Sequence, residues 1–507
     1  MKPEEKFDVI VIGAGMGGLS AANFLAKYDK RVLVIEKHDK PGGYLTSFIR
    51  KGFQFDSGVF HLTEMGENET IPSFIRFWGG KIDTIKVQYK FKIFVGENEY
   101  IIDGGHSEED LIKYFPKERK SIIKFFQISN KMLDETMKSG PPKAPYDMSL
   151  FEKISFGLKS FIKSPTFMKY SRKNGNEFLA KLFSNKILAN IIYSYYPIKN
   201  LIFFSFSYGW LNMKRNENYY PIGGMQAIPD ECVTTLKRNK GTIKLNTEVS
   251  KILVIDDKAI GVKCKNGEEY YSEIIISNSP IHYTLNHLLE EHDKITDFRN
   301  HINKRGVFFS PMLLFLGIDE KFDSKGINFH IFIDEEAMNV NIDELNPSNC
   351  PILMIELPKQ EKQIGRSFLI GVFLPYSFSN EWNKEKNNTR GEKYRELKQD
   401  VMEKILKRIE NKLGKNFHNS IKYKLASTPL TMERYTYNYR GSILGWKMDK
   451  ENYGKFISHT TPIENLYLVG QWIFPNGGVP GVLASGYYLA KKILERDNID
   501  LEQEIKK

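Results

Sequence analysis

The chain has 507 residues, of which 41% are hydrophobic and 13% aromatic, so it is long and apolar enough for two or three domains with large cores. This composition excludes a disordered chain, and the 3 cysteines are too few and too far apart for a disulfide framework or a zinc knuckle. Of the formal net charge of +11, +9 lies between residues 110 and 190, which hold 16 Lys and Arg but 7 Asp and Glu.

The N-terminal sequence MKPEEKF places acidic residues where a secretion signal needs a basic start followed by an apolar run. The longest apolar stretches, Val307–Ile318 and Leu201–Leu211, are too short or too interrupted to cross a bilayer. We therefore expect a cytoplasmic protein in a reducing compartment.

The first chemical motif follows a short apolar run, FDVIVIG, that is typical of a buried strand. Gly13, Gly15 and Gly18 form a GxGxxG turn, a helical pattern follows, and a second apolar strand ends at Glu36. In such a βαβ unit the glycines let the backbone approach a pyrophosphate, and the acid accepts hydrogen bonds from the ribose. The complete unit favours dinucleotide binding over a fortuitous glycine turn.

A second glycine pair, Gly42 and Gly43, follows the acid where NAD dehydrogenases normally enter their next helix. This arrangement is typical of FAD enzymes of the glutathione-reductase-like class. Gly223–Gly224 then opens an amphipathic helix, and residues 241–280 predict a meander of short strands. In flavoproteins of this class, the block around Val249 lies against the adenine ring.

The remaining chain predicts a helical segment at 110–210, strands at 307–318, 329–334, 352–356 and 368–374, and a helix at 391–413. Near the end, NLYLVG is a short strand, followed by a glycine-rich turn and a final helix. We expect an α/β fold with α+β insertions. A discontinuous Rossmann-type FAD-binding domain would comprise residues 1–75, 215–285 and 430–507, and a substrate domain would comprise residues 76–214 and 286–429.

Together these segments resemble the phytoene desaturase, carotenoid isomerase and retinol saturase family of FAD-dependent oxidoreductases. The resemblance rests on GAGMGGLSAA, the PGG turn, GFQFDSGVFH, YPIGGMQAIPD and LYLVGQWIFPNGGVPGVLASG, in the family's order and spacing. The chain departs from the desaturases at Trp472, Ile473 and Phe474, where those enzymes often carry a histidine.

The resemblance implies noncovalent FAD and a long apolar polyene or isoprenoid substrate. Gly470 and Gln471 would approach the pyrophosphate and ribityl chain. The C-terminal glycine turn, residues Gly478, Val479, Pro480, Gly481 and Val482, would face the flavin ring with the backbone N–H groups of its non-proline residues. His61 is the candidate catalytic residue near the ring, with a structural histidine as the equal alternative. Asp56 also falls near the ring and is expected to pin a turn.

Three activities stay open within the family, namely desaturation, cis–trans isomerisation and saturation, with desaturation first on frequency alone. An amine-oxidase-like flavoenzyme is another alternative. A prenyl-lipid carrier of the GDP-dissociation-inhibitor type is the non-enzymatic one, although a carrier does not need all of these glycine motifs together. The histidines His282, His287 and His292 are spaced wrongly for a metal site and are expected on the surface, and we expect no metal.

The basic segment between 110 and 190 mixes its lysines with aromatic and aliphatic residues, as in LKSFIKSPTFMKY. A solvated helical face is the ordinary interpretation, and peripheral contact with an anionic membrane surface is the sharper one. No recognition motif supports nucleic-acid binding. A membrane-borne substrate would favour the membrane interpretation, with Lys159, Lys163 and Lys169 at the contact.

Overall fold

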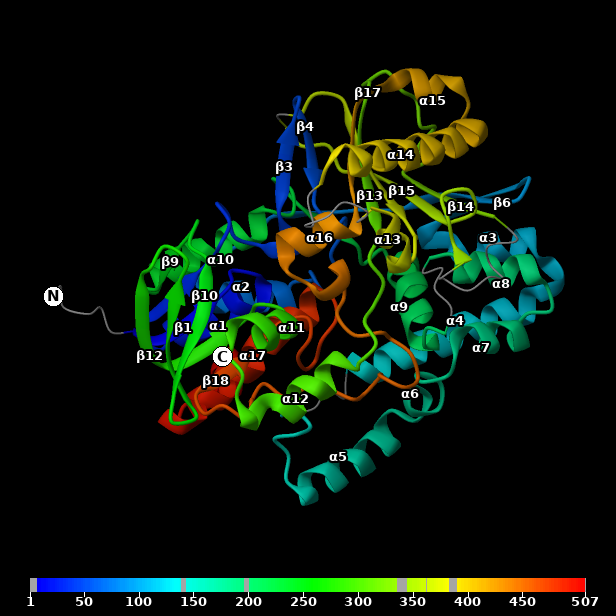
Figure 1. The fold of residues 1–507 in the computed structure, drawn as a ribbon. Helices are drawn as coiled ribbons and strands as arrows, with labels where there is room; N and C mark the ends of the chain where they lie inside the picture. Colours follow the sequence, from blue (N-terminus) through cyan, green and yellow to red (C-terminus); the bar gives the residue numbers. More distant parts are fainter. Residues whose placement is uncertain are drawn as a thin grey trace.

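The computed structural model describes residues 7–137, 143–195, 200–334, 344–361, 363–382 and 390–506. Two large β-sheets lie side by side, each with helices packed against it, and a group of helices extends from the second sheet (Figure 1). The fold is therefore mixed α/β, as the sequence predicts.

The first sheet has a parallel core in the order β18-β12-β1-β2-β9. Through its first residues β12 also pairs with β11, and β11 pairs with β10, so that these three antiparallel strands form a meander. Strand β12 therefore belongs both to the parallel core and to the meander. These strands are β1 (Phe7–Ile12), β2 (Val32–Ile35), β9 (Thr242–Lys244), β10 (Val249–Ile255), β11 (Lys258–Cys264), β12 (Glu269–Ser277) and β18 (Leu466–Leu468).

Successive residues of β1 enter different cores, because side chains alternate across a strand. Val9 and Val11 pack with the helical layer, whereas Ile10 and Ile12 pack with the meander. The helical layer contains α1 (Met16–Ala26), α2 (Thr70–Phe77), α10 (Ala227–Arg238) and α17 (Val479–Leu494). Helices α1 and α17 approach closely at Gly486, where a Cβ would lie 2.6 Å from the Gly17 oxygen.

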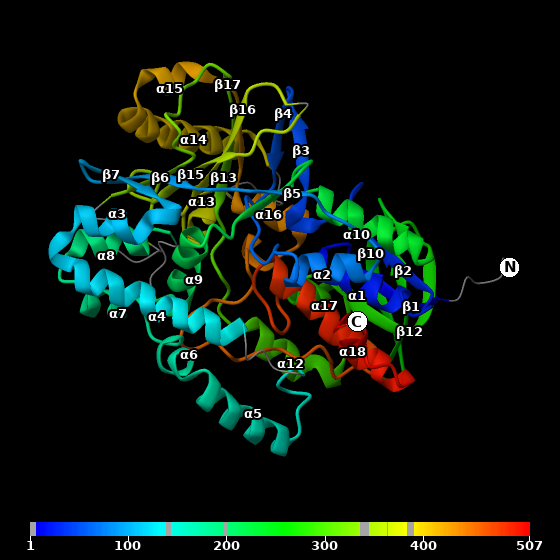
Figure 2. The same cartoon turned by 180° about the vertical axis from the view of Figure 1, so that it is seen from behind.

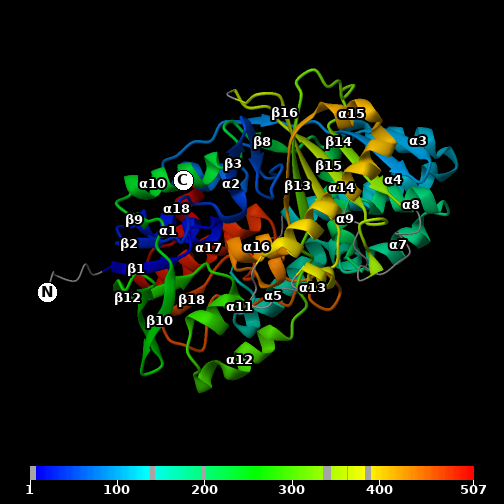
Figure 3. The ribbon, with the colours of Figure 1, turned by 45° about the horizontal axis from the view of Figure 1, so that its top comes forward.

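The second sheet has the order β17-β13-β16-β15-β14-β6-β7 and is antiparallel except for the pair β14–β6. Helix α14 (Glu392–Leu413) lies across one face of it (Figure 3), and the hairpin of β3 (Ser47–Arg50) and β4 (Phe53–Asp56) packs on the other. The strands are β6 (Lys90–Val95), β7 (Asn98–Asp103), β13 (Met312–Ile318), β14 (Phe329–Ile333), β15 (Ile352–Leu357), β16 (Arg366–Val372) and β17 (Ile421–Ser427).

The segment predicted to be helical contains seven helices among its described residues. They are α3 (Ser107–Tyr114), α4 (Arg119–Met137), α5 (Leu150–Lys163), α6 (Pro165–Tyr170), α7 (Gly175–Leu182), α8 (Lys186–Tyr193) and α9 (Phe203–Lys214). Seen from both sides, α5 stands clear of the rest of the chain (Figures 1 and 2). Among the described residues, no helix combines the length and apolar character that a membrane crossing requires.

The shorter elements connect these layers. They are β5 (Thr84–Lys86), β8 (Tyr219–Pro221), α11 (Ile281–Tyr283), α12 (Asp293–Asn303), α13 (Ser379–Trp382), α15 (Lys415–Ser420), α16 (Pro429–Thr436) and α18 (Leu501–Lys506).

The strand predicted at 307–318 is only half correct, because β13 begins at Met312. Pro311 lacks the N–H that a central strand needs at each ladder position. The residues before it bond instead to the loop that precedes the C-terminal strand, since Phe308 N–H donates to the Gly445 oxygen at 2.8 Å.

Candidate cofactor and active site

The GxGxxG turn joins β1 to α1 and has no room for side chains. Gly13 has a φ of +93°, which only glycine adopts readily. A Cβ on Gly18 would lie 2.4 Å from the Gly13 oxygen, and one on Gly15 would lie 2.7 Å from Asn278 Nδ2. Among the described side chains none caps α1 at Gly15. The helix therefore presents bare backbone N–H groups, which suit a phosphate.

Glu36 holds this turn in shape from the end of β2. Its Oε2 accepts a hydrogen bond from Ala14 N–H at 2.7 Å, and its Oε1 accepts one from His38 N–H at 2.9 Å. The carboxyl is largely buried, and the Glu36 carbonyl accepts from Thr247 N–H at 2.9 Å. Glu36 thus lies at the meeting point of the turn, β2 and the segment leading to Val249, where the predicted ribose would bind.

The second glycine pair lies directly beside the first turn. Gly42 N–H donates to the Ala14 oxygen at 2.9 Å, and the backbones of Gly15 and Gly42 form an isolated parallel bridge. Gly42 and Gly43 both have positive φ, at +124° and +60°. The two turns therefore lie against each other, with Gly43 exposed and Gly13 and Gly15 partly accessible beside it.

Val249 begins β10 and pairs with Cys264, with its side chain buried in the core under the meander. It follows Thr247, which donates to Glu36, by two residues. The structure thus places Val249 two residues after a backbone hydrogen bond to Glu36.

The C-terminal strand returns to the N-terminal turn through Gly470, whose φ is +105°. Its N–H donates to Ser485 Oγ at 3.1 Å, and a Cβ on it would lie 2.8 Å from Asn278 Oδ1. Gln471 Nε2 donates to Asn438 Oδ1 at 2.8 Å. The structure therefore brings Gly470 beside the GxGxxG turn, and Gln471, the next residue, is held by Asn438.

Asn278 joins these parts and was not identified from the sequence. Its N–H donates to the Ile12 oxygen at 2.9 Å, and its side-chain amide borders Gly15, Gly17 and Gly470. The available signal was its position directly after the buried strand β12, since polar residues at the carboxyl ends of parallel strands commonly meet a ligand.

The C-terminal glycine turn, which follows Gly470, leads into the N-terminus of α17, with Gly478 as the cap residue. A Cβ on Gly478 would meet no atom within 4 Å, whereas one on Gly481 would lie 2.1 Å from the Asn476 oxygen. Residues 478–482 all keep accessible surface, and the next residue, Leu483, is fully buried. The positive end of a 16-residue helix therefore faces open space beside half-buried apolar side chains.

His61 lies on the segment after β4 and is partly accessible. Its Nδ1 is hydrogen-bonded to the Tyr89 hydroxyl at 3.2 Å, and Phe60 contacts its ring edge to face, with centroids 4.5 Å apart. Burial lowers the pKa of His61 to about 3 and raises the pKa of Tyr89. Near pH 7 both groups are therefore neutral.

Asp56 is fully buried, and its partners among the described residues hold a turn, as the sequence predicts. It accepts hydrogen bonds from Ser47 Oγ at 2.5 Å, from the Tyr220 hydroxyl and from Met225 N–H at 3.1 Å. These bonds fix the β3–β4 hairpin to the Gly223–Gly224 turn. Burial raises the pKa of this carboxyl, and Asp56 has no surface through which it could touch a substrate.

The expectation that His282 lies on the surface is wrong. His287 is exposed, but His282 is buried against the Tyr439 ring at 4.5 Å and the Trp472 ring at 5.0 Å. Its position at the start of α11 places it under the loop that precedes β18, and burial lowers its pKa to about 4. Within the described residues, no group of three or more His, Cys, Asp or Glu could hold a metal ion.

The three residues that depart from the desaturase pattern are buried core residues. Trp472 packs against Trp446 and donates from Nε1 to Asn438 Oδ1 at 2.8 Å, and Ile473 and Phe474 are equally buried. The departure therefore contributes packing below the turn, while Gln471 and residues 478–482 keep the accessible positions.

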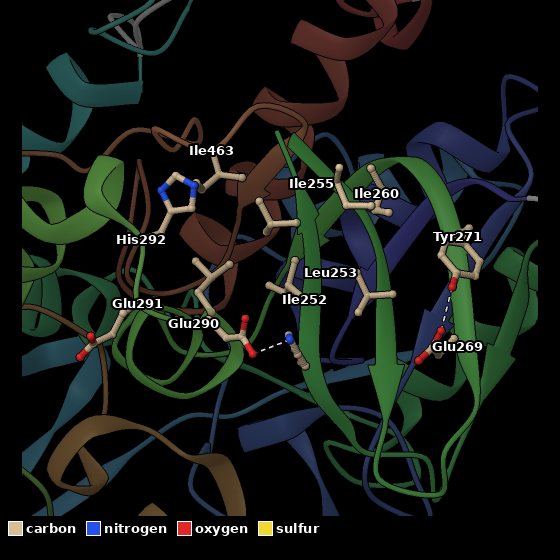
Figure 4. Close-up of a pocket in the computed structure, with 13 residues that line it drawn as sticks. Ile252, Leu253, Ile255, Ile260, Glu269, Tyr271, Glu290, Glu291, His292 and Ile463 are labelled. Carbon is tan, nitrogen blue, oxygen red and sulfur yellow. Dashed lines mark hydrogen bonds and ion pairs between the residues drawn. The ribbon is translucent and has the colours of Figure 1, made fainter. Parts of the chain in front are cut away.

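A groove of about 340 Å³ lies elsewhere, on the outer side of the meander (Figure 4). Ile252, Ile255 and Ile260 form its apolar floor, and the Lys251–Glu290 ion pair lies across one end. It contains none of the predicted cofactor residues, so the candidate active site lies at the glycine turns and not here.

The chain belongs to the family of flavin-containing amine oxidoreductases, whose sequence profile matches residues 16–494. This family confirms the prediction of an FAD-dependent oxidoreductase, and the glycine turns described above fit such a cofactor because added side chains would fill their surface.

Relatives confirm the predicted resemblance within this family. The chain is 26% identical to an all-trans-retinol 13,14-reductase of Danio rerio, over 98% of this chain and 87% of that protein. It is 27% identical to prolycopene isomerase 1 of an Oncidium hybrid cultivar, over 96% of this chain and 84% of that protein. Among solved structures, a putrescine oxidase double mutant matches with a TM-score of 0.66 and 13% identity, over 97% of this chain and 100% of that one, which shows a shared fold.

Proposed function

We propose that this enzyme transfers hydride between FAD and a carbon–carbon bond of a long apolar polyene or isoprenoid lipid. The observation that carries the proposal is the open N-terminus of α17, which belongs to the same turn as Gly470 and so to the same site as the GxGxxG turn. The names of the relatives, a retinol reductase and a prolycopene isomerase, support the substrate class.

The cofactor residues divide between the two ends of FAD in this proposal, as in the glutathione-reductase-like class. The turn at Gly13, Gly15 and Gly18 would hold the pyrophosphate, supported by Gly42 and Gly43, and Glu36 and the Val249 block would hold the adenosine. The domain of residues 1–75, 215–285 and 430–507 would bind the cofactor. Residues 76–214 and 286–429 would enclose the substrate.

A bound flavin supplies the hydride chemistry, so the chain needs to supply position, dryness and charge. With the cofactor bound, the N-terminus of α17 would stabilise negative charge that develops on it. The half-buried apolar side chains Val479 and Val482 would exclude water from that part of the site. His61 and Tyr89 form a neutral hydrogen-bonded pair, which would position the substrate beside the ring in this proposal.

The reaction direction has three candidates. Dehydrogenation is the first prediction from the sequence, whereas the names of the relatives favour double-bond reduction or isomerisation. An amine-oxidase activity follows from the family description alone. A prenyl-lipid carrier would need no cofactor, which the family membership does not favour.

One anaerobic experiment separates these candidates. Purified yellow enzyme is mixed with retinol or prolycopene in detergent, once with oxidised and once with photoreduced flavin. Bleaching of the oxidised form indicates dehydrogenation, recovery of colour by the reduced form indicates saturation, and a change in isomer composition without a change in colour indicates isomerisation. Bleaching by small amines alone would refute the polyene proposal.

We also propose that the enzyme works at the inner face of the cytoplasmic membrane. The substrate class dissolves in bilayers, and the excess of basic residues between 110 and 190 suits an anionic surface. The three cysteines are free and buried, which agrees with a reducing compartment.

A further inference from the structure

Helix α5 exposes an unusual amount of apolar surface. None of its residues is buried, and Phe151, Phe161 and Ile162 are 81%, 70% and 76% exposed. Leu150, Ile154 and Leu158 are also largely exposed. A helix of a soluble protein normally buries such residues in a core, so we expect this exposed face to contact a partner.

The exposed apolar residues share one side of the helix. At about 100° per residue, the six positions fall within an arc of about 120°. Lys153, Lys159 and Lys163 lie outside that arc, and Phe156 is the aromatic residue that turns back and is half-buried. An apolar face bordered by lysines matches an anionic bilayer, in which rings enter the acyl region and ammonium groups meet the headgroups.

The helix is fixed to the molecule at both ends. Ser149 and Glu152 form a capping box, and just before it Tyr146 is hydrogen-bonded to His459 and Asp147 pairs with Lys492. At the other end Glu135 accepts from Phe167 N–H at 2.7 Å. These contacts give α5 a defined orientation relative to the cofactor turn, since His459 Nε2 also contacts the Ser485 oxygen at 2.9 Å.

A chain of accessible aromatic side chains leads inward from this base. Phe167 of α6 meets Phe204 of α9 edge to face at 5.5 Å, and Phe204 contacts Tyr208 at 5.9 Å. The Tyr208 hydroxyl is hydrogen-bonded to Thr63 Oγ1 at 2.9 Å, two residues beyond His61. Along the first two turns of α9, Phe204, Ser205 and Tyr208 keep accessible surface while their neighbours are buried.

We propose that α5 is an insertion helix, which lies in the surface of an anionic bilayer with Phe151, Leu158 and Phe161 below the headgroups. An apolar molecule then passes from the bilayer along Phe167, Phe204 and Tyr208 to the segment that carries His61. The insertion of α5 is inferred from the geometry of α5 alone. The identity of the molecule that follows the aromatic path rests on the proposed function.

The test uses the full-length flavin-bound enzyme and phosphatidylcholine vesicles with or without phosphatidylglycerol. Changing Phe151, Leu158 and Phe161 together to Ser is expected to lower vesicle partitioning by at least about tenfold, because each ring or chain loses its transfer into the apolar region. Changing Lys153, Lys159 and Lys163 to Gln should weaken binding only to the anionic vesicles, and less at high salt. The matched control, Ile255→Ser with Ile364→Ser, removes similarly exposed apolar side chains elsewhere and should bind as the parent does.

A depth probe provides an independent readout. The five native tryptophans are buried, so Leu158→Trp adds an exposed indole whose fluorescence brominated lipids should quench. Unchanged partitioning of the serine variant, or fluorescence of the added indole that the lipids do not quench, overturns the proposal. The proposal is also overturned if the parent is a dimer and the serine variant is a monomer, because α5 would then contact a second copy of the chain.

Turnover of polyene in vesicles, compared with turnover in detergent, tests the aromatic path separately. The serine variant should keep its flavin spectrum and its turnover of polyene in detergent, but lose turnover of polyene held in vesicles. If the parent turns over no polyene at all, the proposed function fails while vesicle partitioning still decides the role of α5. Equal loss in detergent and in vesicles would contradict a role in delivery.

Discussion

The Cα of Gly470 lies 2.8 Å from the point that a Cβ on Gly17 would occupy. The start of the first helix and the end of the last strand of the sheet therefore meet backbone to backbone, with the Asn278 amide beside them. This contact joins the GxGxxG turn to the turn that opens α17, as the proposed FAD site across both turns requires.

Replacing Gly17 by Ala should therefore cost the enzyme its flavin. The new methyl must push Gly470 away or shift α1, and either movement separates the two halves of the cofactor site. We expect the flavin-to-protein ratio after purification to fall by about tenfold or more, equivalent to at least about 1.4 kcal/mol of binding free energy. Gly371→Ala is the control, because a Cβ there meets nothing within 4 Å, and it should retain flavin.

Glu36→Ala tests whether this acid shapes the turn as well as holding a ribose. Its loss leaves Ala14 N–H and His38 N–H without their acceptor, which should cost about 1–3 kcal/mol of unfolding free energy in the flavin-free protein. Urea unfolding of the apoprotein measures this. If the variant lost flavin affinity with unchanged apoprotein stability, Glu36 would act on the ligand alone.

The sequence was sufficient for the parts of the site that local chemistry dictates. Gly13 must adopt a positive φ after a buried strand, and Glu36 ends the next strand, so both were predictable from spacing. Asn278 was missed because its role arises only where three distant segments meet. His282 was misplaced for a related reason, since its burial depends on Tyr439 and Trp472 folding over it from the other end of the chain.

Asp56→Ala should destabilise the protein without changing the chemistry of the molecules that fold. The change removes the shared acceptor of Ser47, Tyr220 and Met225 N–H, and a lost buried carboxylate network costs about 3 kcal/mol or more. The thermal unfolding temperature should fall, while turnover per bound flavin stays near the parental value. Asp56→Asn keeps one acceptor oxygen, so its unfolding temperature should lie between those of the parent and of Asp56→Ala.

Acid should destabilise the fold through its buried histidines, and His330 offers a clean test. Burial lowers the pKa of His330 to about 3, so between pH 6.5 and 3 only the unfolded chain takes up that proton. Stability therefore falls with decreasing pH, by about 1.4 kcal/mol per pH unit for each such histidine well below pH 6.5. His330→Phe should make the decline from pH 7 to pH 5 shallower by about 2 kcal/mol. An unchanged slope would mean that His330 is protonated in the folded state.

His61→Asn is the decisive substitution for the candidate catalytic residue. Because burial lowers the pKa of His61 to about 3, its neutral ring can position or hydrogen-bond but cannot donate as an imidazolium near pH 7. We expect the variant to bind flavin normally and to lose turnover by about tenfold to a hundredfold, a usual range for one hydrogen-bonding group near a reacting centre. The pH dependence of turnover should keep its shape in the variant, because His61 does not titrate between pH 5 and 9. Tyr89→Phe removes only the hydroxyl at 3.2 Å and should cause a smaller loss if that bond merely orients the ring. A structural histidine would instead show reduced unfolding temperature and flavin content with unchanged turnover per bound flavin.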